Sequence, residues 1–312
     1  MDMGKPGIAI TIRSFGTGGQ ALERLRDRAS ILSRNTSGRR LTEDELIRAL
    51  REAEGVIAGT EPFTRRVLES SPSLRAISRV GSGTDSIDLA TARERGIAVL
   101  VTRDAPVRAV AEHTLALMLA CLKQIPRRDR AMREGKEIGD PGGLLGGRSV
   151  GIIGLGRIGR EVARLLEPFG CRILYHDIAL PPDTVTAWER KEYLRDLLEV
   201  SDILSLHATP PASGKPILDE EAFHSIKPGV IIINTARGSL IDEDALLQTI
   251  RNGTVAGAGL DVFRTEPYRG PLLACPQVIA TPHVASSTVE SRAAMEDEAV
   301  EHLLLALEGG GR

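Results

Sequence analysis

The chain has 312 residues, of which 42% are hydrophobic and 26% charged, and its formal net charge is −2. This length allows one large or two ordinary α/β domains, and the near-balanced charge does not favour nucleic acid as a partner. Three scattered cysteines without metal-binding spacing, together with the lack of the ~18-residue apolar run that a membrane span needs, predict a cytoplasmic protein with no membrane segment and no metal.

Short apolar runs alternate with helical patterns over the first hundred residues. The hydrophobic spacing predicts helices at 42–54 and 62–70. Runs rich in Val, Ile and Ala predict strands at 8–12, 56–58, 74–78 and 98–101. Strands that alternate with helices form mostly parallel sheets, so we expect an α/β domain here.

The segment 107–124 is predicted to form one long helix that is too apolar to lie alone on the surface. We expect it to pack between domains or between subunits. His113 lies on this helix, and packing or an interface contact is its predicted role. The glycine-rich stretch 139–143 that follows predicts a loop within 133–147.

Strands and helices alternate regularly from residue 149 onwards. The predicted strands are 149–153, 172–176, 203–207, 230–234, 255–260 and 278–280. The predicted helices are 157–168, 190–199, 219–225, 242–251 and 287–308. Four of these strands are nearly continuous apolar runs, which is typical of a parallel sheet with helices on both faces.

The first of these strands leads into a glycine-rich turn, Gly154-Leu155-Gly156-Arg157-Ile158-Gly159, and a helix follows. In this setting the first glycine permits the tight turn, the second lets the backbone approach a pyrophosphate, and the third lets the helix pack close to the strand. The phosphates would lie at the helix N-terminus. Asp177 lies 18 residues after Gly159 (177 − 159 = 18). A carboxylate there accepts from ribose hydroxyls and repels a 2′-phosphate, so the pattern predicts NAD rather than NADP.

Three polar signatures follow later apolar runs: Arg237 in Asn-Thr-Ala-Arg-Gly, Glu266 before a proline, and His283 in Thr-Pro-His. Each comes after a predicted strand, so the three side chains are expected along one sheet edge. An Arg fork binds a carboxylate at two points. A His moves a proton near neutral pH, and a neighbouring carboxylate can orient it. The three residues are therefore a candidate active site.

Together these motifs resemble the D-isomer-specific 2-hydroxyacid dehydrogenases, in particular the phosphoglycerate-dehydrogenase-like branch. The resemblance extends to Arg-Val-Gly-Ser-Gly-Thr-Asp-Ser-Ile-Asp-Leu at 79–89, Val-Ala-Glu-His-Thr at 110–114 and Gly-Leu-Asp-Val-Phe at 259–263. It covers nearly the whole chain, and several motifs in a fixed order are more specific than any one of them.

The resemblance implies a two-domain α/β architecture. A Rossmann-type NAD-binding domain over 105–283 would be inserted into a flavodoxin-like substrate-binding domain formed by 1–104 and 284–312. The active site would lie in the cleft between the domains. Similar proteins are usually dimers, so a homodimer joined largely through 107–124 is expected.

The resemblance also implies roles for individual residues. His283 would donate the proton, Glu266 would be its charge partner, and Arg237 would bind the substrate carboxylate. The residues expected to contact NAD are Gly154, Gly156, Arg157, Ile158, Gly159, Asp177, His207, Thr235 and Asp261, the last through the nicotinamide carboxamide. The residues expected to bind substrate are Arg79, Val80, Gly81 and Ser82, where a Gly-rich turn would offer unpaired backbone N–H groups.

The expected function is an NAD-dependent oxidoreductase acting on a small 2-hydroxy or 2-keto acid, with 3-phosphoglycerate narrowly ahead of glyoxylate or hydroxypyruvate. Arg79 could meet a substrate phosphate. The stretch 58–61, Ala-Gly-Thr-Glu, has no cation, and Glu61 would repel a phosphate if it faced the substrate. An NAD-sensing binding protein of the corepressor type is the alternative from a different class. The reaction direction is left open.

Overall fold

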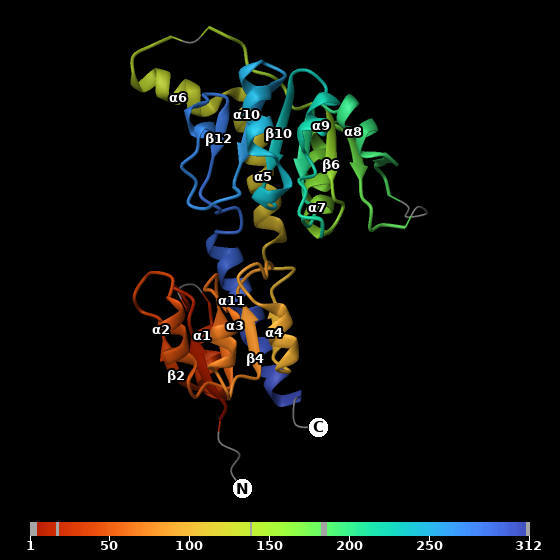
Figure 1. Ribbon diagram of the computed structural model, residues 1–312. Coiled ribbons are helices and arrows are strands. Elements are labelled where there is room, and N and C mark those ends of the chain that lie inside the picture. Colours follow the sequence, from red (N-terminus) through yellow and green to blue (C-terminus); the bar gives the residue numbers. More distant parts are fainter. Residues whose placement is uncertain (1–4, 17–18, 138, 182–185, 310–312) are drawn as a thin grey trace. The chain divides into compact units, whose positions relative to one another are not determined.

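The structure is a computed structural model that describes residues 5–16, 19–137, 139–181 and 186–309. The chain forms two compact units (Figure 1). The flavodoxin-like unit comprises Met1–Pro106 and Ser287–Arg312, and the Rossmann-type unit comprises Val107–Ser286. The two crossings between units thus follow residues 106 and 286, where the sequence had suggested 104 and 283.

The flavodoxin-like unit contains a parallel sheet of order β2-β1-β3-β4-β5. Its strands are β1 Gly7–Ile10, β2 Ser30–Arg34, β3 Gly55–Ala58, β4 Ala76–Arg79 and β5 Ala98–Val101. Its helices are α1 Ala21–Arg28, α2 Glu43–Leu50, α3 Arg65–Glu69, α4 Leu89–Glu94 and α11 Val289–Gly309. The strand order 2-1-3-4-5 is that of flavodoxin-like folds.

Two cores cover the two faces of this sheet. Ile8 and Ile10 of β1 pack with residues of α1 and α11, whereas Ala9 between them packs with residues of α2 and α3. Side chains alternate between faces along a strand, so one short strand contributes to both cores. Helix α11 contacts β3, β4 and β5. Residues from both ends of the sequence therefore form the flavodoxin-like unit together.

The Rossmann-type unit contains a parallel sheet of order β12-β11-β10-β9-β6-β7-β8. Its strands are β6 Ser149–Ile153, β7 Arg172–His176, β8 Glu189–Arg190, β9 Ile203–Leu206, β10 Val230–Asn234, β11 Val255–Leu260 and β12 Val278–Ala280. Its helices are α5 Val107–Lys123, α6 Ile125–Arg133, α7 Arg157–Leu166, α8 Leu194–Val200, α9 Glu220–His224 and α10 Glu243–Arg251. Counted from β6, the order is the dinucleotide-binding 3-2-1-4-5-6, extended by β12.

Helices cover both faces of the second sheet. Ile231 and Ile233 of β10 pack with residues of α5 and α7, whereas Ile232 packs with residues of α8, α9 and α10. Helix α5 contacts β10, β11, β12 and α7. These contacts explain why α5 is so apolar, because a helix that packs against a sheet and a neighbouring helix buries much of its surface.

The strands of the second sheet end level with one another. Across the sheet, His176 pairs with Ile153, which pairs with Leu206. Leu206 pairs with Asn234, Asn234 with Leu260, and Leu260 with Ala280. The loops after β6, β7, β9, β10, β11 and β12 therefore all begin at one straight edge. Ligands of open α/β sheets bind at this carboxyl edge.

Several elements were not predicted from the sequence. They are α1, β2, α4, α6 and β8. Strand β2 lies at the sheet edge with Leu32 half exposed, so it lacks the apolar run of a buried strand. Helix α6 is separate from α5 because Gln124 between them has φ +52°, which no helix interior accepts. The short β8 occupies the start of the helix predicted at 190–199, so α8 begins at Leu194.

Candidate active site

The glycine turn after β6 has the geometry that a pyrophosphate site needs. Gly154 has φ +92°, and a Cβ there would lie 2.7 Å from the backbone nitrogen of Ala208. A Cβ on Gly159 would lie 2.2 Å from the Gly154 oxygen, so the helix could not approach the turn with a larger residue. A Cβ on Gly156, by contrast, would meet no atom within 4 Å. Gly156 caps the N-terminus of α7, where backbone N–H groups favour an anion.

Asp177 follows β7 and is joined to this turn. Its Oδ2 accepts a hydrogen bond of 2.7 Å from the backbone N–H of Leu155. Its Oδ1 accepts from the N–H groups of Ala179 and Leu180, at 2.7 and 3.1 Å. These bonds fix the carboxylate at the carboxyl edge beside the glycine turn. A carboxylate oxygen can accept more than one hydrogen bond, so acceptor capacity remains for ribose hydroxyls.

His207 begins the loop after β9 on the same edge. Its Nε2 lies 2.8 Å from the Oγ of Ser205. Desolvation by the surrounding protein lowers the pKa of His207 to about 3, so the ring is neutral near pH 7. It can therefore offer a hydrogen bond to a ligand but no positive charge.

The loop after β10 is ordered by its own side chains. Asn234 is buried, its Nδ2 donates to the Arg237 carbonyl at 2.9 Å, and its Oδ1 accepts from the Ala236 N–H at 3.0 Å. The hydroxyl of Thr235 lies 2.8 Å from that of Thr114 on α5. Arg237 Nη1 donates to the Ala236 carbonyl at 2.7 Å. Because Asn234 bonds on both sides of the turn, the backbone that carries Arg237 is held in one conformation.

Gly238 brings this loop against the loop after β11. A Cβ on Gly238 would lie 1.9 Å from the carbonyl carbon of Phe263 and 2.3 Å from the nitrogen of Arg264. No side chain fits there without moving the backbone. The close approach therefore joins the segment of Arg237 to the segment that leads into Glu266.

Glu266 and His283 form a direct pair. His283 Nδ1 lies 2.8 Å from Glu266 Oε2, with side-chain exposures of 50% and 37%. The other oxygen, Oε1, accepts from the Phe263 N–H at 3.2 Å. The rings of Phe263 and Tyr268 stack with centroids 4.2 Å apart and brace the turn between them. With Nδ1–H donated to a carboxylate, Nε2 of His283 is the atom left to exchange a proton with a substrate.

Asp261 organises the turn that carries His283. The carboxylate is fully buried and accepts from Thr281 Oγ1 at 2.6 Å and from the N–H groups of Val284 and Ala285, both at 2.9 Å. Its carbonyl accepts from the His283 N–H at 2.8 Å. His283 has φ +54°, a conformation that costs about 1–2 kcal/mol for an L-residue. These bonds offset that cost, and no sequence pattern had predicted the part of Thr281 in them.

The predicted substrate residues of the flavodoxin-like unit follow β4. The Val80 N–H donates to the Ala58 carbonyl at 2.8 Å, and the Gly81 N–H donates to Thr102 Oγ1 at 2.7 Å. The N–H groups of Val80 and Gly81 are therefore paired within the protein, whereas the sequence had predicted unpaired donors there. Among the described residues the Ser82 N–H has no such partner. Arg79 packs over Gly81, since its Nη1 would lie 2.0 Å from a Cβ at that glycine.

Glu61 is buried at the same edge, after β3. It is 2% exposed, and its Oε2 accepts from the Gly59 N–H at 2.7 Å and from Thr11 Oγ1 at 3.5 Å. The sequence had raised it only as a carboxylate that would repel phosphate. The structure adds that this carboxylate is enclosed by the loops after β1 and β3, where water screens its charge poorly.

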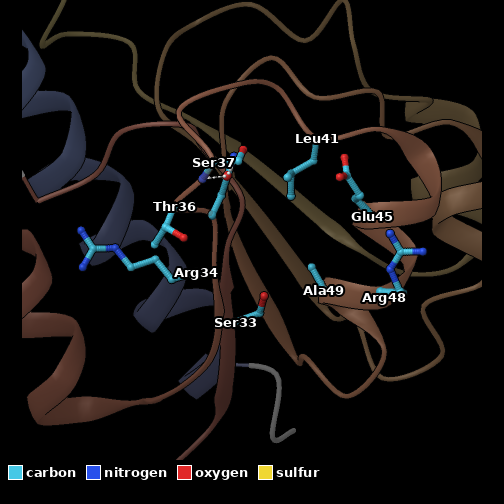
Figure 2. A pocket seen from close by; sticks show the side chains of 9 residues that line it. Ser33, Arg34, Thr36, Ser37, Leu41, Glu45, Arg48 and Ala49 are labelled. Atoms are coloured by element: carbon cyan, nitrogen blue, oxygen red, sulfur yellow. Dashed lines mark hydrogen bonds between the residues drawn. The ribbon is translucent and has the colours of Figure 1, made fainter.

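A pocket of about 360 Å³ lies on the flavodoxin-like unit, and Figure 2 shows the side chains that line it. It is lined by residues 33–37, at the end of β2 and just after it, and by Leu41, Glu45, Arg48 and Ala49 around α2. Two of its three charged side chains are used by the fold: Arg34 donates to the Phe15 carbonyl and Glu45 pairs with Arg39. None of the predicted site residues lines it.

Two other kinds of site are absent from the described part of the chain. It contains no group of three or more His, Cys, Asp or Glu side chains placed to hold a metal ion. Nor do residues 5–16, 19–137, 139–181 and 186–309 include a helix with the length and apolarity needed to cross a bilayer.

Known proteins resemble this chain in sequence and in structure. Residues 115–285 match the family model of the D-isomer specific 2-hydroxyacid dehydrogenase NAD binding domain. A hydroxypyruvate reductase of Thermotoga maritima is 39% identical over 276 residues, which are 86% of this chain and 89% of that protein. A D-3-phosphoglycerate dehydrogenase of Mycobacterium tuberculosis is 38% identical over 85% of this chain, but the match spans only 51% of its length. The solved NADPH-dependent glyoxylate/hydroxypyruvate reductase of Sinorhizobium meliloti has a TM-score of 0.85 and 32% identity, with 98% of this chain and 96% of that one covered.

Proposed function

The chain belongs to the D-isomer-specific 2-hydroxyacid dehydrogenase family, and on that premise we propose that it reduces an unphosphorylated 2-keto acid of the hydroxypyruvate and glyoxylate class with NADH. An NAD(P)-dependent 2-hydroxyacid dehydrogenase needs a proton donor near a dinucleotide site. The observation that carries the proposal is the His283–Glu266 pair of 2.8 Å, on the sheet whose carboxyl edge also holds the glycine turn.

The chain's own residues account for the proton and for substrate orientation. When bound, the nicotinamide supplies a hydride to the carbonyl carbon. His283 Nε2 gives its proton to the carbonyl oxygen, so the keto group becomes a hydroxyl. Glu266 holds the ring through Nδ1 and stabilises the positive charge of the protonated form. Arg237 binds the substrate carboxylate through its fork, and its loop is fixed by Asn234.

We propose NAD as the cofactor. Asp177 is fixed beside the glycine turn by the Leu155 N–H, and Ile178 and Ala179 after it carry no charge. A carboxylate there repels the extra phosphate of NADP. The nearby cation Arg190 donates to the carbonyls of Asp177, Leu180 and Pro181. Its guanidinium is thus occupied by the backbone, which disfavours its use for a 2′-phosphate.

Two observations favour an unphosphorylated substrate over 3-phosphohydroxypyruvate. The edge of the flavodoxin-like unit that holds the predicted substrate residues also holds the enclosed carboxylate of Glu61, and the stretch from Ala58 to Glu61 carries no cation. A phosphate of nearly two negative charges would be repelled there. Among the relatives, a hydroxypyruvate reductase and two glyoxylate reductases carry names of enzymes for unphosphorylated keto acids.

We further propose a homodimer formed through α5, α6 and the loop after α6. Helix α6 lies at the outside of the Rossmann-type unit (Figure 1). Large apolar side chains on α6 and at Leu144 after it are exposed: Ile125 at 53%, Met132 at 82% and Leu144 at 72%. Exposed apolar side chains that together form a patch mark interaction surfaces in soluble proteins. Light scattering after gel filtration tests this, and a monomer at micromolar concentration would refute it.

A panel of keto acids with NADH tests the proposed function. We expect NADH oxidation with hydroxypyruvate and glyoxylate, and a higher KM with 3-phosphohydroxypyruvate. His283→Ala should lower kcat by about 10²- to 10⁴-fold, the range of general acid–base catalysis, and leave NADH affinity unchanged. If no keto acid oxidises NADH while NADH alters self-association, the chain is a nucleotide-sensing binding protein and the enzyme proposal fails.

Glu61→Gln tests the substrate preference separately. The amide keeps an oxygen for the Gly59 N–H and removes the charge. We expect kcat/KM for 3-phosphohydroxypyruvate relative to hydroxypyruvate to rise on the order of tenfold, since two unit charges roughly 8–16 Å apart at an effective dielectric constant of about 20 interact by about 1–2 kcal/mol. Glu54→Gln, which alters a partly exposed carboxylate paired with Arg75, is the matched control. An unchanged ratio in both variants would remove Glu61 from substrate choice.

A further inference from the structure

His113 makes a contact that its predicted packing role does not require. It lies on α5, and its Nε2 is 3.1 Å from Thr281 Oγ1 and 3.6 Å from Asp261 Oδ1. Its side chain is 22% exposed, whereas Asp261 is 0% exposed. Thr281 belongs to the turn that carries His283, and Asp261, which follows β11, accepts hydrogen bonds from that turn. A side chain of α5, far away in sequence, therefore contacts the two residues that hold the turn of His283, the proposed proton donor.

The hydrogen-bond geometry fixes the direction of each bond. The Thr281 hydroxyl has one proton, and it lies 2.6 Å from a carboxylate oxygen. Both Asp261 oxygens also accept backbone N–H groups, so the carboxylate accepts and Thr281 donates to it. At its contact with His113, Thr281 must then accept. His113 Nε2 consequently carries a hydrogen, in the neutral tautomer or in the charged ring.

This chain of bonds leads directly to the His283 backbone. His113 donates to Thr281, Thr281 donates to Asp261, and Asp261 accepts from the residues that follow His283. The Asp261 carbonyl also accepts from the His283 N–H. The φ of +54° at His283 has to be maintained by these bonds, because L-residues rarely adopt it. Loss of the His113 N–H would therefore weaken the bonds by which Asp261 holds the backbone around His283.

We propose that His113 is a positioning residue for the reaction, which acts through Thr281 and Asp261 to hold the His283 turn in its reactive geometry. This inference rests on the proposed role of His283. Partners that hold a catalytic side chain are often as important as its immediate contacts, because a displacement of about 1 Å can cost 10²-fold in rate. Substrate carboxylate binding through Arg237 comes from a different loop and should be preserved.

The test compares variants that differ in one donor. His113→Leu removes the N–H at similar size, whereas His113→Gln keeps an N–H that reaches about as far. We expect His113→Leu to lower kcat about 10- to 100-fold with hydroxypyruvate, with KM and the NADH dissociation constant within about twofold of wild type. His113→Gln should restore kcat to within about threefold. Thr281→Val should match His113→Leu, and the double variant should be no slower than Thr281→Val.

Glu112→Gln, next to His113 on the exposed side of α5 and paired with Arg108, is the control and should keep wild-type kcat. Equal kcat values for wild type and His113→Leu would overturn the proposal, and so would equal losses in the Leu and Gln variants. If His113→Leu does not fold, His113→Asn takes its place in the test, since the shorter amide does not reach Thr281. A wild-type kcat of His113→Asn would then refute the positioning role of His113. The proposed function fails separately, when wild type is inactive or His283→Ala is fully active.

Discussion

The contact at Gly238 offers a quantitative test of how the active-site loops are joined. In Gly238→Ala the new Cβ would lie 1.9 Å from the Phe263 carbonyl carbon, and ordinary contact begins at 3.4 Å. The two backbones must therefore separate by about 1.5 Å (3.4 − 1.9). Neither atom belongs to a flexible side chain, so the movement falls on the segments that carry Arg237 and Glu266.

The expected cost follows from that displacement. A misplacement of about 1 Å at reacting groups costs about 10²-fold, so kcat/KM for hydroxypyruvate should fall by at least that factor. Overpacking of this kind destabilises a fold by about 1–3 kcal/mol. NADH affinity should fall less than kcat/KM, because the glycine turn and Asp177 follow other strands, whereas Thr235 and Asp261 lie on the displaced segments. The assays are NADH oxidation, NADH fluorescence titration and urea unfolding.

Two other glycines supply controls. A Cβ on Gly309 or Gly156 would meet no atom within 4 Å. Gly309→Ala, at the end of α11, should therefore leave NADH affinity and rate unchanged. Gly156→Ala should keep stability but weaken NADH binding, because its Cβ would enter the proposed pyrophosphate position. A Gly238→Ala protein with wild-type kcat/KM would refute the idea that this contact sets the distance between the two loops.

Four further outcomes are expected. Arg237→Lys should raise the KM for the keto acid strongly and lower kcat, because an ammonium cannot bind a carboxylate at two points; an unchanged KM in steady-state assays contradicts the clamp. Glu266→Gln should lower kcat about 10²-fold with little change in KM, and equal kcat values would show that the carboxylate is dispensable. Asp177→Ala should shift the ratio of kcat/KM for NADH and NADPH towards NADPH, and a constant ratio means that the ribose assignment is wrong. His207 has a folded pKa of about 3 against an ordinary 6.5, so between these values the unfolded chain binds a proton that the folded chain does not, and stability falls with falling pH. The urea midpoint of wild type should therefore drop more than that of His207→Gln from pH 6.5 to 4, and parallel pH profiles would exclude the effect.

The sequence predicted the features that follow from local periodicity. Strands such as β10, with three consecutive isoleucines, must be covered on both faces, and this implies helices between parallel strands. The carboxyl ends of parallel strands lie at one edge, so polar residues after β10 and β12 were expected on the same side of the sheet. The family relationship was likewise predicted from the motifs, and the comparisons confirm it.

Other features depend on contacts between residues far apart in sequence, and local patterns carry no trace of them. The hydrogen bond between His113 and Thr281 joins residues 168 positions apart. The Gly81 N–H donates a hydrogen bond to Thr102, which directly follows β5. Edge strand β2 is half exposed, so its residues have no apolar run to mark it. In each case the missing information is a tertiary neighbour, not a local preference.

The distribution of these features over the two sheets suggests how chemistry and substrate choice are separated. On the Rossmann-type sheet the strands end level with one another, and the loops that follow them carry Arg237, Glu266 and His283. Changes in these loops should therefore alter kcat for every substrate alike. Glu61 lies after β3 in the flavodoxin-like unit, and its hydrogen bonds with Gly59 and Thr11 are made within that unit. Its replacement should therefore change the ratio between substrates without a change in NADH affinity. A variant at Glu61 that lowered all rates equally would contradict this division.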